Sequence, residues 1–145
     1  MQPNIVDDVR AHFGEGCFAC GRANPVGLGI DGFTVEGDEV LATYRPIPDH
    51  RGLASRLHGG LVATALDEIM VWAGILIAGV MSVTGTMDLR FRSPAPIDGT
   101  LVLAGSVTER RGRRLRLSGE LRTDAVHAEA SGLYLVTETV EEMLA

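Results

Sequence analysis

The sequence predicts an α+β fold in which a curved antiparallel sheet of five to six strands wraps around one long buried helix. The first observation is a run from Leu61 to Val80 in which Thr64, Asp67 and Glu68 are the only polar residues. Such a run leaves no stripe for solvent, so the helix that it forms has to be surrounded by other structure. The second observation is that apolar residues recur at every second position for most of the chain after Gly79, which is typical of strands with one buried face. Both sets of apolar surface are buried only if the sheet curves around the helix.

Composition and charge narrow the function classes. The chain has 145 residues, of which 46% are hydrophobic, and this suits one domain, residues 1–145, with a substantial core. Its formal net charge of −6 argues against general nucleic-acid binding, which needs a basic surface. We expect no membrane association, because the long apolar run carries two acids near its centre. The first residues lack the pattern of a secretory signal and the cysteines are too few for a disulfide scaffold, so we expect a cytoplasmic protein.

Residues 1–27 are predicted to form a short amphipathic helix, Ile5 to Phe13, and an irregular loop that contains Cys17 and Cys20. The Cys-x-x-Cys pair has three interpretations. It forms a redox dithiol, it supplies half of a zinc site, or its two thiols pack the loop against the body of the domain. A zinc site usually needs four ligands, and the chain has no second pair, although His12 offers a third ligand. We favour packing, and we predict no metal and no cofactor.

The other elements follow from alternation and turn residues, taken in chain order. A hairpin and a proline-flanked connection precede the helix, at Leu28 to Glu36, Glu39 to Arg45 and Pro46 to Arg56. Four strands and a short helical tail come after it, at Val83 to Phe91, Leu101 to Glu109, Leu115 to Leu121, Ala125 to Thr137 and residues 138–145. Strict alternation along the first of these strands places Val83 and Gly85 on one face, which we assign to the core. It places Thr84 on the other face.

Paired glycines at the helix start and the acids within the helix suggest a binding site. The first N–H groups of a helix have no partner inside it, so Gly59 and Gly60 offer their backbone to ligand oxygens that carry negative charge. A buried carboxylate such as Asp67 pairs, protonates or lies at a wet functional opening. Gly59 and Asp67 are separated by roughly 12 Å along one helix. Both reach one substrate only if a two-fold dimer brings in a second copy of the helix.

Three motifs carry a resemblance to a known family. The chain resembles the hotdog-fold acyl-CoA thioesterases of the phenylacetate-degradation (PaaI-like) type in His58-Gly59-Gly60, in Leu66-Asp67-Glu68, and in Thr84 with the strand Met87-Asp88-Leu89-Arg90-Phe91-Arg92-Ser93-Pro94. The upstream Cys17-Phe-Ala-Cys20-Gly with Asn24-Pro25-Val-Gly27-Leu28 is similar to a subgroup of them. The resemblance runs from about Cys17 to Val136. It implies a hotdog fold, an acyl-CoA substrate, and a homodimer or a dimer of dimers (a homotetramer).

The resemblance also implies roles for single residues. The backbone N–H that matches Gly59 binds the thioester carbonyl as an oxyanion site. The acid that matches Asp67 comes from the partner subunit and acts as general base on water or as nucleophile. The hydroxyl that matches Thr84 helps to orient the attacking water.

One position departs from the family pattern. Family members often have an Asn six residues before the histidine, whereas this chain has Gly52. Arg51 or His50 is a candidate substitute for positioning the water or the carbonyl. For His58 itself, we favour a hydrogen bond that fixes the loop over a role in proton transfer.

Two further groups are candidates for the substrate site. Gly60 is expected to line it, and Glu68, about 100° around the helix from Asp67, is expected to pair with an arginine or with the dimer partner. A basic cluster between Arg110 and Arg116 suits the phosphates of coenzyme A, for which the guanidinium fork is well shaped. Its candidate members are Arg111, Arg113 and Arg114. The same cluster is equally typical of a soluble hairpin tip.

The sequence therefore predicts an acyl-CoA thioesterase. Two alternatives remain: an acyl-CoA-binding hotdog protein without turnover, which the missing Asn favours, and a hotdog hydratase or dehydratase, which needs a His–acid pair beside the carbonyl. The acyl pocket is assigned to Val62, Leu66, Met70 and the loop from His50 to Leu57. Aromatic, branched and straight acyl chains all fit this assignment.

Overall fold

The computed structural model describes residues 5–13 and 15–145 of the chain, so parts of the predicted N-terminal segment, residues 1–4 and 14, lie outside the described residues. The helices are α1 (Ile5–Phe13), α2 (Gly59–Leu76) and α3 (Val140–Leu144). The strands are β1 (Asp31–Glu36), β2 (Glu39–Tyr44), β3 (Val80–Phe91), β4 (Leu101–Arg111), β5 (Arg114–Arg122) and β6 (Val126–Thr139). Two short 3-10 helices, Pro48–His50 and Leu53–Ser55, lie in the connection before α2.

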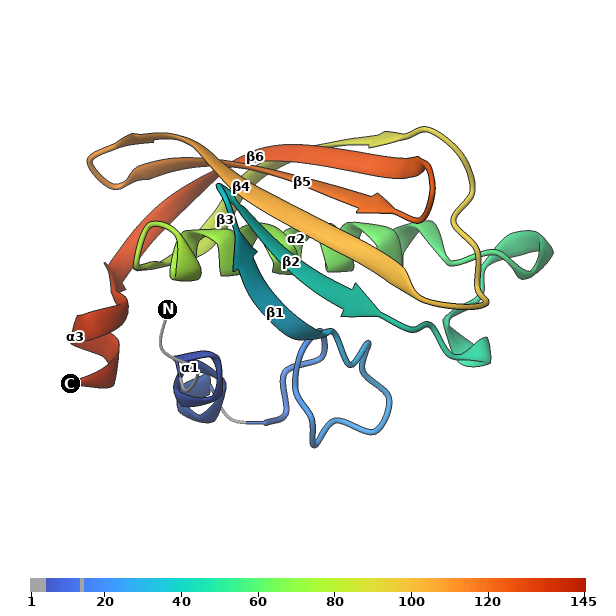
Figure 1. The fold of residues 1–145 in the computed structure, drawn as a ribbon, viewed down its shortest axis with the longest axis horizontal. Helices are drawn as coiled ribbons and strands as arrows, with labels where there is room; N and C mark the ends of the chain where they lie inside the picture. The colour runs from blue at the N-terminus through green and yellow to red at the C-terminus, as the bar shows by residue number, and fades with distance from the viewer. Residues whose placement is uncertain (1–4, 14) are drawn as a thin grey trace.

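The six strands form one antiparallel sheet in the order β1-β2-β4-β5-β6-β3. Figure 1 shows α2 lying along one face of this sheet, which curves around it. This arrangement confirms the predicted hotdog fold. The order also leaves β1 and β3 as the two edge strands, each with a single neighbour in the described part of the chain.

The central helix is held by its apolar sequence and by close contact with the sheet. Its largest side chains, among them Trp72, Leu66 and Met70, are fully buried. Backbone and sheet approach closely at Gly105, where a Cβ atom would lie 2.6 Å from the carbonyl oxygen of Ile69. By length and composition α2 is apolar enough to cross a membrane, but half of that stretch is buried inside this fold. Its apolar character is therefore explained by the core that it fills.

The strand that follows α2 corrects one prediction. Thr84 faces the helix and Val83 is 54% exposed, the reverse of the strict alternation that the sequence suggested. The cause is a β-bulge, because β3 pairs Thr84 with Tyr134 but Thr86 with Leu133, so Gly85 is an extra residue. The bulge exchanges the two faces of the strand, and it is what points the Thr84 hydroxyl at α2.

The remaining boundaries differ from the predictions by a few residues. The first strand begins at Asp31 rather than Leu28, and β6 continues to Thr139, so the helical tail is confined to α3. Helix α1 has the predicted bounds. It is tied to the body through Arg10, which is buried and whose guanidinium donates to the carbonyl oxygen of Cys20 at 3.0 Å and to Asp31 at 3.0 Å.

Candidate functional site

The start of α2 presents one backbone N–H group without a partner. His58 is the N-cap residue, and its Nδ1 accepts a hydrogen bond from the N–H of Gly60 at 2.9 Å. The N–H groups of Leu61 and Val62 donate to the carbonyl oxygen of His58. The Gly59 N–H has no acceptor within residues 5–13 and 15–145. At this positive end of the helix, Gly59 is thus the group that is free to bind an anionic oxygen.

This geometry assigns different roles to the three residues of the His-Gly-Gly motif. His58 caps the helix, as the preferred interpretation of the sequence stated. Because Nδ1 is an acceptor, the neutral ring carries its proton on Nε2. Gly60 has its N–H already engaged by His58, so its backbone contributes little to ligand binding.

A hollow lies directly beside the free N–H. Gly59 lines it together with apolar side chains from α2, the connection before it, the end of β3, the segment after β3, and β6, namely Val62, Leu57, Phe91, Pro94 and Ala128. A Cβ atom at Gly59 would meet the Phe91 ring at 3.8 Å, an ordinary contact distance. Two of the predicted acyl-pocket residues, Val62 and Leu57, are therefore placed here, while Leu66 and Met70 lie in the core.

Asp67 lies two turns further along α2 and is held by two hydroxyl groups. Thr84 Oγ1 donates to Asp67 Oδ1 at 2.7 Å, and Tyr134 Oη donates to the same oxygen at 2.7 Å. Burial, and then its hydrogen bond to the Asp67 carboxylate, raise the pKa of Tyr134, so this hydroxyl keeps its proton and stays a donor. Since both donors use Oδ1, the geometry leaves Oδ2 available to a reacting group.

Tyr134 is the residue of this site that sequence reasoning missed. It lies on the buried face of β6. Its partner is 67 positions away in the chain, so only the pairing of β3 with β6 brings the two together.

Within one chain, the Gly59 N–H and the Asp67 carboxylate lie too far apart to contact the same atom. Asp67 follows Gly59 by eight residues on a continuous helix, which corresponds to roughly 12 Å. Both groups nevertheless lie along the same edge strand, because Thr84 and Phe91 both belong to β3.

Glu68 points away from this site. Its Oε2 accepts a hydrogen bond from Trp72 Nε1 at 2.9 Å, and Trp72 itself stacks on Phe33 with a centroid separation of 4.4 Å. Burial raises the pKa of Glu68, and no arginine, lysine or histidine forms an ion pair with it in the described part of the chain. The predicted pairing with an arginine is therefore not seen, and the structure does not bring Glu68 together with Asp67 and Gly59.

The connection before α2 supports the helix start. The N–H of His58 donates to the carbonyl oxygen of His50 at 3.0 Å, and His50 Nδ1 is bonded to the Tyr44 hydroxyl at 2.9 Å. At Gly52, a Cβ atom would lie 3.0 Å from the Cα of His58, so the glycine permits a close approach of the two backbones. His50, one candidate substitute for the missing Asn, is thus engaged in holding the loop.

The tip of this connection is exposed and strained. Ala54 and Ser55 both have positive φ values, 53° and 55°, which are unfavourable for residues with a Cβ atom. Leu53 beside them is 92% exposed. This apolar tip borders a second hollow that Gly59 and Pro94 also line.

The arginines lie at a different place from the glycines. They surround the turn between β4 and β5, which Figure 1 shows at the end of the molecule opposite to the start of α2. Arg111 and Arg114 line one shallow hollow, together with Arg116. Arg113 turns away and donates to the carbonyl oxygen of Val136 at 3.1 Å.

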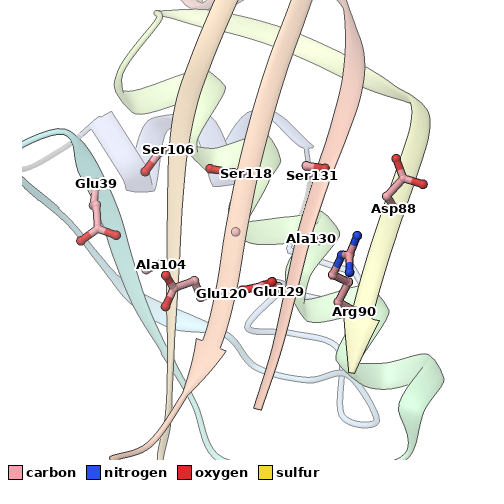
Figure 2. A pocket seen from close by; sticks show the side chains of 11 residues that line it. Glu39, Asp88, Arg90, Ala104, Ser106, Ser118, Glu120, Glu129, Ala130 and Ser131 are labelled. Carbon is pink, nitrogen blue, oxygen red and sulfur yellow. The ribbon is translucent and has the colours of Figure 1, made fainter. Parts of the chain in front are cut away.

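A polar hollow on the outer face of the sheet is separate from all of these groups. Figure 2 shows its lining, in which short hydroxyl side chains on neighbouring strands, Ser106, Ser118 and Ser131, lie between charged ones such as Glu39 and Arg90. Cross-strand pairing places Ser106 beside Ser118 and Ser118 beside Ser131. The serines are on the face away from α2, so this hollow has no access to Asp67 or Gly59.

Comparison with protein families gives a match over just over half of the chain. The description of the matching family is the thioesterase superfamily, and the match covers residues 55–129. This range contains the start of α2, Asp67 and the bulged strand β3.

Comparison with curated proteins gives distant relatives. The chain is 29% identical to the acyl-coenzyme A thioesterase THEM4 of Bos taurus over 141 residues, which cover 93% of this chain and 56% of that protein. It is 36% identical to an uncharacterised mitochondrial protein of Candida albicans over 69 residues, 47% of this chain and 31% of that protein. The chain thus spans about half or less of the length of these relatives.

Solved structures share the fold. A thioesterase superfamily protein, RHA08564, superposes with a TM-score of 0.77 at 22% identity, over 83% of this chain and 60% of that one. The protein smu.793 of Streptococcus mutans, bound to acetyl CoA, superposes with a TM-score of 0.68 at 18% identity, over 75% and 91% of the two chains. At these identities the likeness supports the hotdog architecture.

Proposed function

Because the chain belongs to the thioesterase superfamily, we propose that it is an acyl-CoA thioesterase of the PaaI-like type that works as a homodimer or as a dimer of dimers. The observation that carries the proposal is the pair of complementary groups on α2, a free N–H at Gly59 and a doubly hydrogen-bonded carboxylate at Asp67. An amide donor stabilises the oxyanion that forms at a thioester carbonyl, and a carboxylate activates the attacking water. The names of the THEM4 relative and of the acetyl-CoA-bound neighbour support this substrate class.

Two copies of the chain complete each site in this proposal. The free edge of β3 carries the exposed apolar side chains Val83 and Phe91, 54% and 57% exposed, which suits a strand that pairs with another. A two-fold axis midway between Thr84 and Phe91, near Met87, sets Thr84 of one copy opposite Phe91 of the other in an antiparallel pair. Since Thr84 contacts Asp67 and Phe91 lies beside Gly59, each carboxylate then faces the other copy's amide.

The residues divide the reaction between them. Water attacks the thioester carbon while Asp67 Oδ2 accepts its proton, and Thr84 and Tyr134 hold the carboxylate through Oδ1. The Gly59 N–H binds the oxygen that becomes negative in the tetrahedral intermediate. When the intermediate collapses, the carbon–sulfur bond breaks, and coenzyme A leaves as the thiol with the proton that Asp67 took up. The alternative route, direct attack by Asp67 as nucleophile, uses the same geometry and ends in hydrolysis of the acyl-enzyme.

The arginines at the β4–β5 turn are proposed to contact the coenzyme A phosphates. Arg111 and Arg114 share a hollow with Glu109 and suit this role, although Arg111 Nε also forms an exposed ion pair with Glu109 at 3.0 Å, whereas Arg113 is bonded to the carbonyl oxygen of Val136. Changing Arg111 and Arg114 to alanine is expected to raise KM for CoA esters several-fold and to leave short thioesters without CoA unaffected. An equal effect on both substrates contradicts the contact.

We place the reaction in the cytoplasm, where the free thiols of the chain stay reduced.

The decisive experiment is subunit complementation between two defective variants. Asp67→Asn removes the carboxylate, and Gly59→Pro removes the free N–H. Proline is well tolerated at the first position of a helix, and the preceding residue already has the extended conformation that it requires, with ψ of 132° at His58. Gly59→Ala is the matched control, since it adds a side chain at an ordinary contact distance but keeps the N–H.

Each variant alone is expected to lose at least about 100-fold in kcat on an acyl-CoA panel read out with a thiol reagent. Co-expression of equal amounts gives one half heterodimers, each with one intact site of two, so about a quarter of wild-type activity returns. Activity that stays at the level of the single variants, or a chain that is monomeric at assay concentration, refutes the shared site. Tight binding of acyl-CoA by wild-type protein without release of thiol selects the non-catalytic alternative.

A further inference from the structure

A second cluster of reactive side chains lies on the opposite side of α2 from Asp67. The sulfur atoms of Cys17 and Cys20 and a carboxylate oxygen of Glu68 all lie within 4.8 Å of one another. The cysteines come from the loop between α1 and β1, and Glu68 comes from the middle of the central helix. The Cys-x-x-Cys spacing brings two of its members together, whereas Glu68 joins them only through the fold.

The carboxylate of the cluster forms no ion pair in the described part of the chain. Cys20 is 1% exposed, and the Glu68 carboxylate accepts its hydrogen bond from the neutral indole of Trp72. Arg10, the buried cation on this side of α2, uses Nε and Nη2 on the carbonyl oxygen of Cys20 and on Asp31, and its Nη1 has no hydrogen-bond partner among the described residues; it attracts Glu68 from a distance but forms no ion pair with it. A carboxylate removed from water in this way is costly unless a cation joins it.

Two sulfurs and one carboxylate oxygen form a donor set that suits a soft cation such as Zn²⁺. Thiolates select soft ions such as Zn²⁺ over Mg²⁺ and Ca²⁺, and zinc accepts Cys and Glu ligands in tetrahedral geometry. A tetrahedral zinc with sulfur at about 2.3 Å needs the sulfurs roughly 3.8 Å apart, within reach of this arrangement by small rotations of the side chains. Cys17 is only half-buried, so solvent supplies a fourth ligand from its side.

The surroundings already orient these donors. Trp72 Nε1 donates to Glu68 Oε2 at 2.9 Å and so fixes this carboxylate, and Arg10 Nε donates to the carbonyl oxygen of Cys20 at 3.0 Å. The N–H of Gly21 closes the turn of the Cys-x-x-Cys segment on the carbonyl oxygen of Cys17 at 2.8 Å. Hydrogen bonds of this kind to the groups next to the ligands are a regular part of metal sites.

We propose that Cys17, Cys20 and Glu68 bind one Zn²⁺ ion, which fastens the N-terminal loop to the central helix. On binding, each thiol releases its proton to solvent and coordinates as thiolate. The ion also anchors Glu68 on this side of α2, away from Asp67 on the other. The site is structural, and it is independent of the proposed thioesterase activity.

The test measures metal directly. Protein produced in zinc-supplemented medium and purified without chelators or a histidine tag is expected to hold about one zinc per chain by elemental analysis. Cys17→Ser and Glu68→Gln are each expected to lower this content at least about tenfold. His12→Ala is the matched control, since His12 is exposed and outside the cluster, and it is expected to keep the metal.

Cobalt gives an independent readout of the ligands. Co²⁺ added to metal-free wild-type protein is expected to produce a thiolate charge-transfer band and visible bands of tetrahedral coordination, and Cys17→Ser is expected to lose the charge-transfer intensity of one sulfur. Wild-type protein that is folded and reduced but holds neither zinc nor cobalt overturns the proposal. A mass lower by two hydrogens that is restored by reductant shows a Cys17–Cys20 disulfide instead, and this also overturns it.

Discussion

Asp67 and Glu68 are neighbours in the sequence with the same charge, yet the two sides of α2 give them opposite surroundings. Asp67 faces the edge strand β3 and receives two hydroxyl hydrogen bonds on one oxygen. Glu68 faces the N-terminal loop, where an indole N–H and two thiols surround it. A rotation of about 100° between successive residues is enough to separate an open position from an enclosed one.

The difference teaches which feature makes a carboxylate available for chemistry. Asp67 lies beneath a strand whose outer edge has no partner in the described sheet, so a second chain can approach it. Glu68 is partly covered by the Cys17–Cys20 loop and by Trp72, and its surroundings suit a small cation better than a substrate. The placement of each acid relative to the sheet edge therefore decides its role more than its residue type does.

The largest expected effect comes from exchanging each acid for its amide. Asp67→Asn is expected to lower kcat by about 10³-fold, since general-base catalysis contributes 10²–10⁴-fold. Glu68→Gln, with the same loss of charge one residue later, is expected to leave kcat within about threefold. Both are measured as thiol release from acyl-CoA per folded chain, with circular dichroism as a check of folding. Comparable losses of kcat in the two variants would contradict the different roles of Asp67 and Glu68.

A smaller effect is expected from removing the donors to each acid. Tyr134→Phe and Thr84→Val each delete one hydrogen bond to Asp67 Oδ1, and each is expected to lower kcat about tenfold, because hydrogen bonds to charged groups contribute about 1.5–3 kcal/mol and part of this acts in the transition state. Trp72→Phe deletes the donor to Glu68 and serves as the matched control. It is expected to lower the free energy of unfolding and to change kcat less than about twofold. A Trp72 variant as impaired in kcat as the Tyr134 variant would show that the two sides of α2 are coupled.

The sequence predicted the helix and most strands because these depend on local patterns. The apolar run from Leu61 to Val80 and the alternation in the later strands state which faces are buried, and the fold follows from covering them. It also singles out Gly59 and Asp67 as candidates, since a glycine pair at a helix start and an acid within an apolar helix are visible without tertiary structure.

What the sequence did not predict depends on contacts between distant segments. The bulge at Gly85 reversed the face of Thr84, because one extra residue breaks the period of two without changing the composition. Tyr134 joins Asp67 only through the pairing of β6 with β3. Glu68 meets the cysteine loop only after α1 and the loop fold onto the helix. The sequence alone therefore places Glu68 at the substrate site with an arginine partner.

The smallest expected effect tests how firmly the Glu68 side is held. Asp31 anchors Arg10, which in turn holds the carbonyl oxygen of Cys20. Burial tends to raise the pKa of Asp31, but the Gly32 N–H, Arg10 and Arg22 outweigh it, so the net pKa lies below its usual value. A lowered pKa means that the folded state favours the ionised form. The resulting stability is present above the ordinary pKa of an aspartate and is lost as the pH falls through the lowered value.

Asp31→Asn is accordingly expected to reduce the free energy of unfolding by about 0.5 kcal/mol at pH 7, because Asp31 is half exposed and such pairs are screened. The difference from wild type should shrink toward zero as the pH falls through the lowered pKa of Asp31, because the wild-type carboxylate then becomes protonated as well. Urea unfolding at pH 7 and at a series of decreasing acidic pH values measures it. Asp38→Asn is the matched control, since Asp38 is exposed and forms no ion pair among the described residues, and its effect at pH 7 is expected to be smaller than that of Asp31→Asn. A pH-independent effect of Asp31→Asn would mean that the charge of Asp31 does not anchor the loop, and that the enclosure of Glu68 depends on packing and on the cation alone.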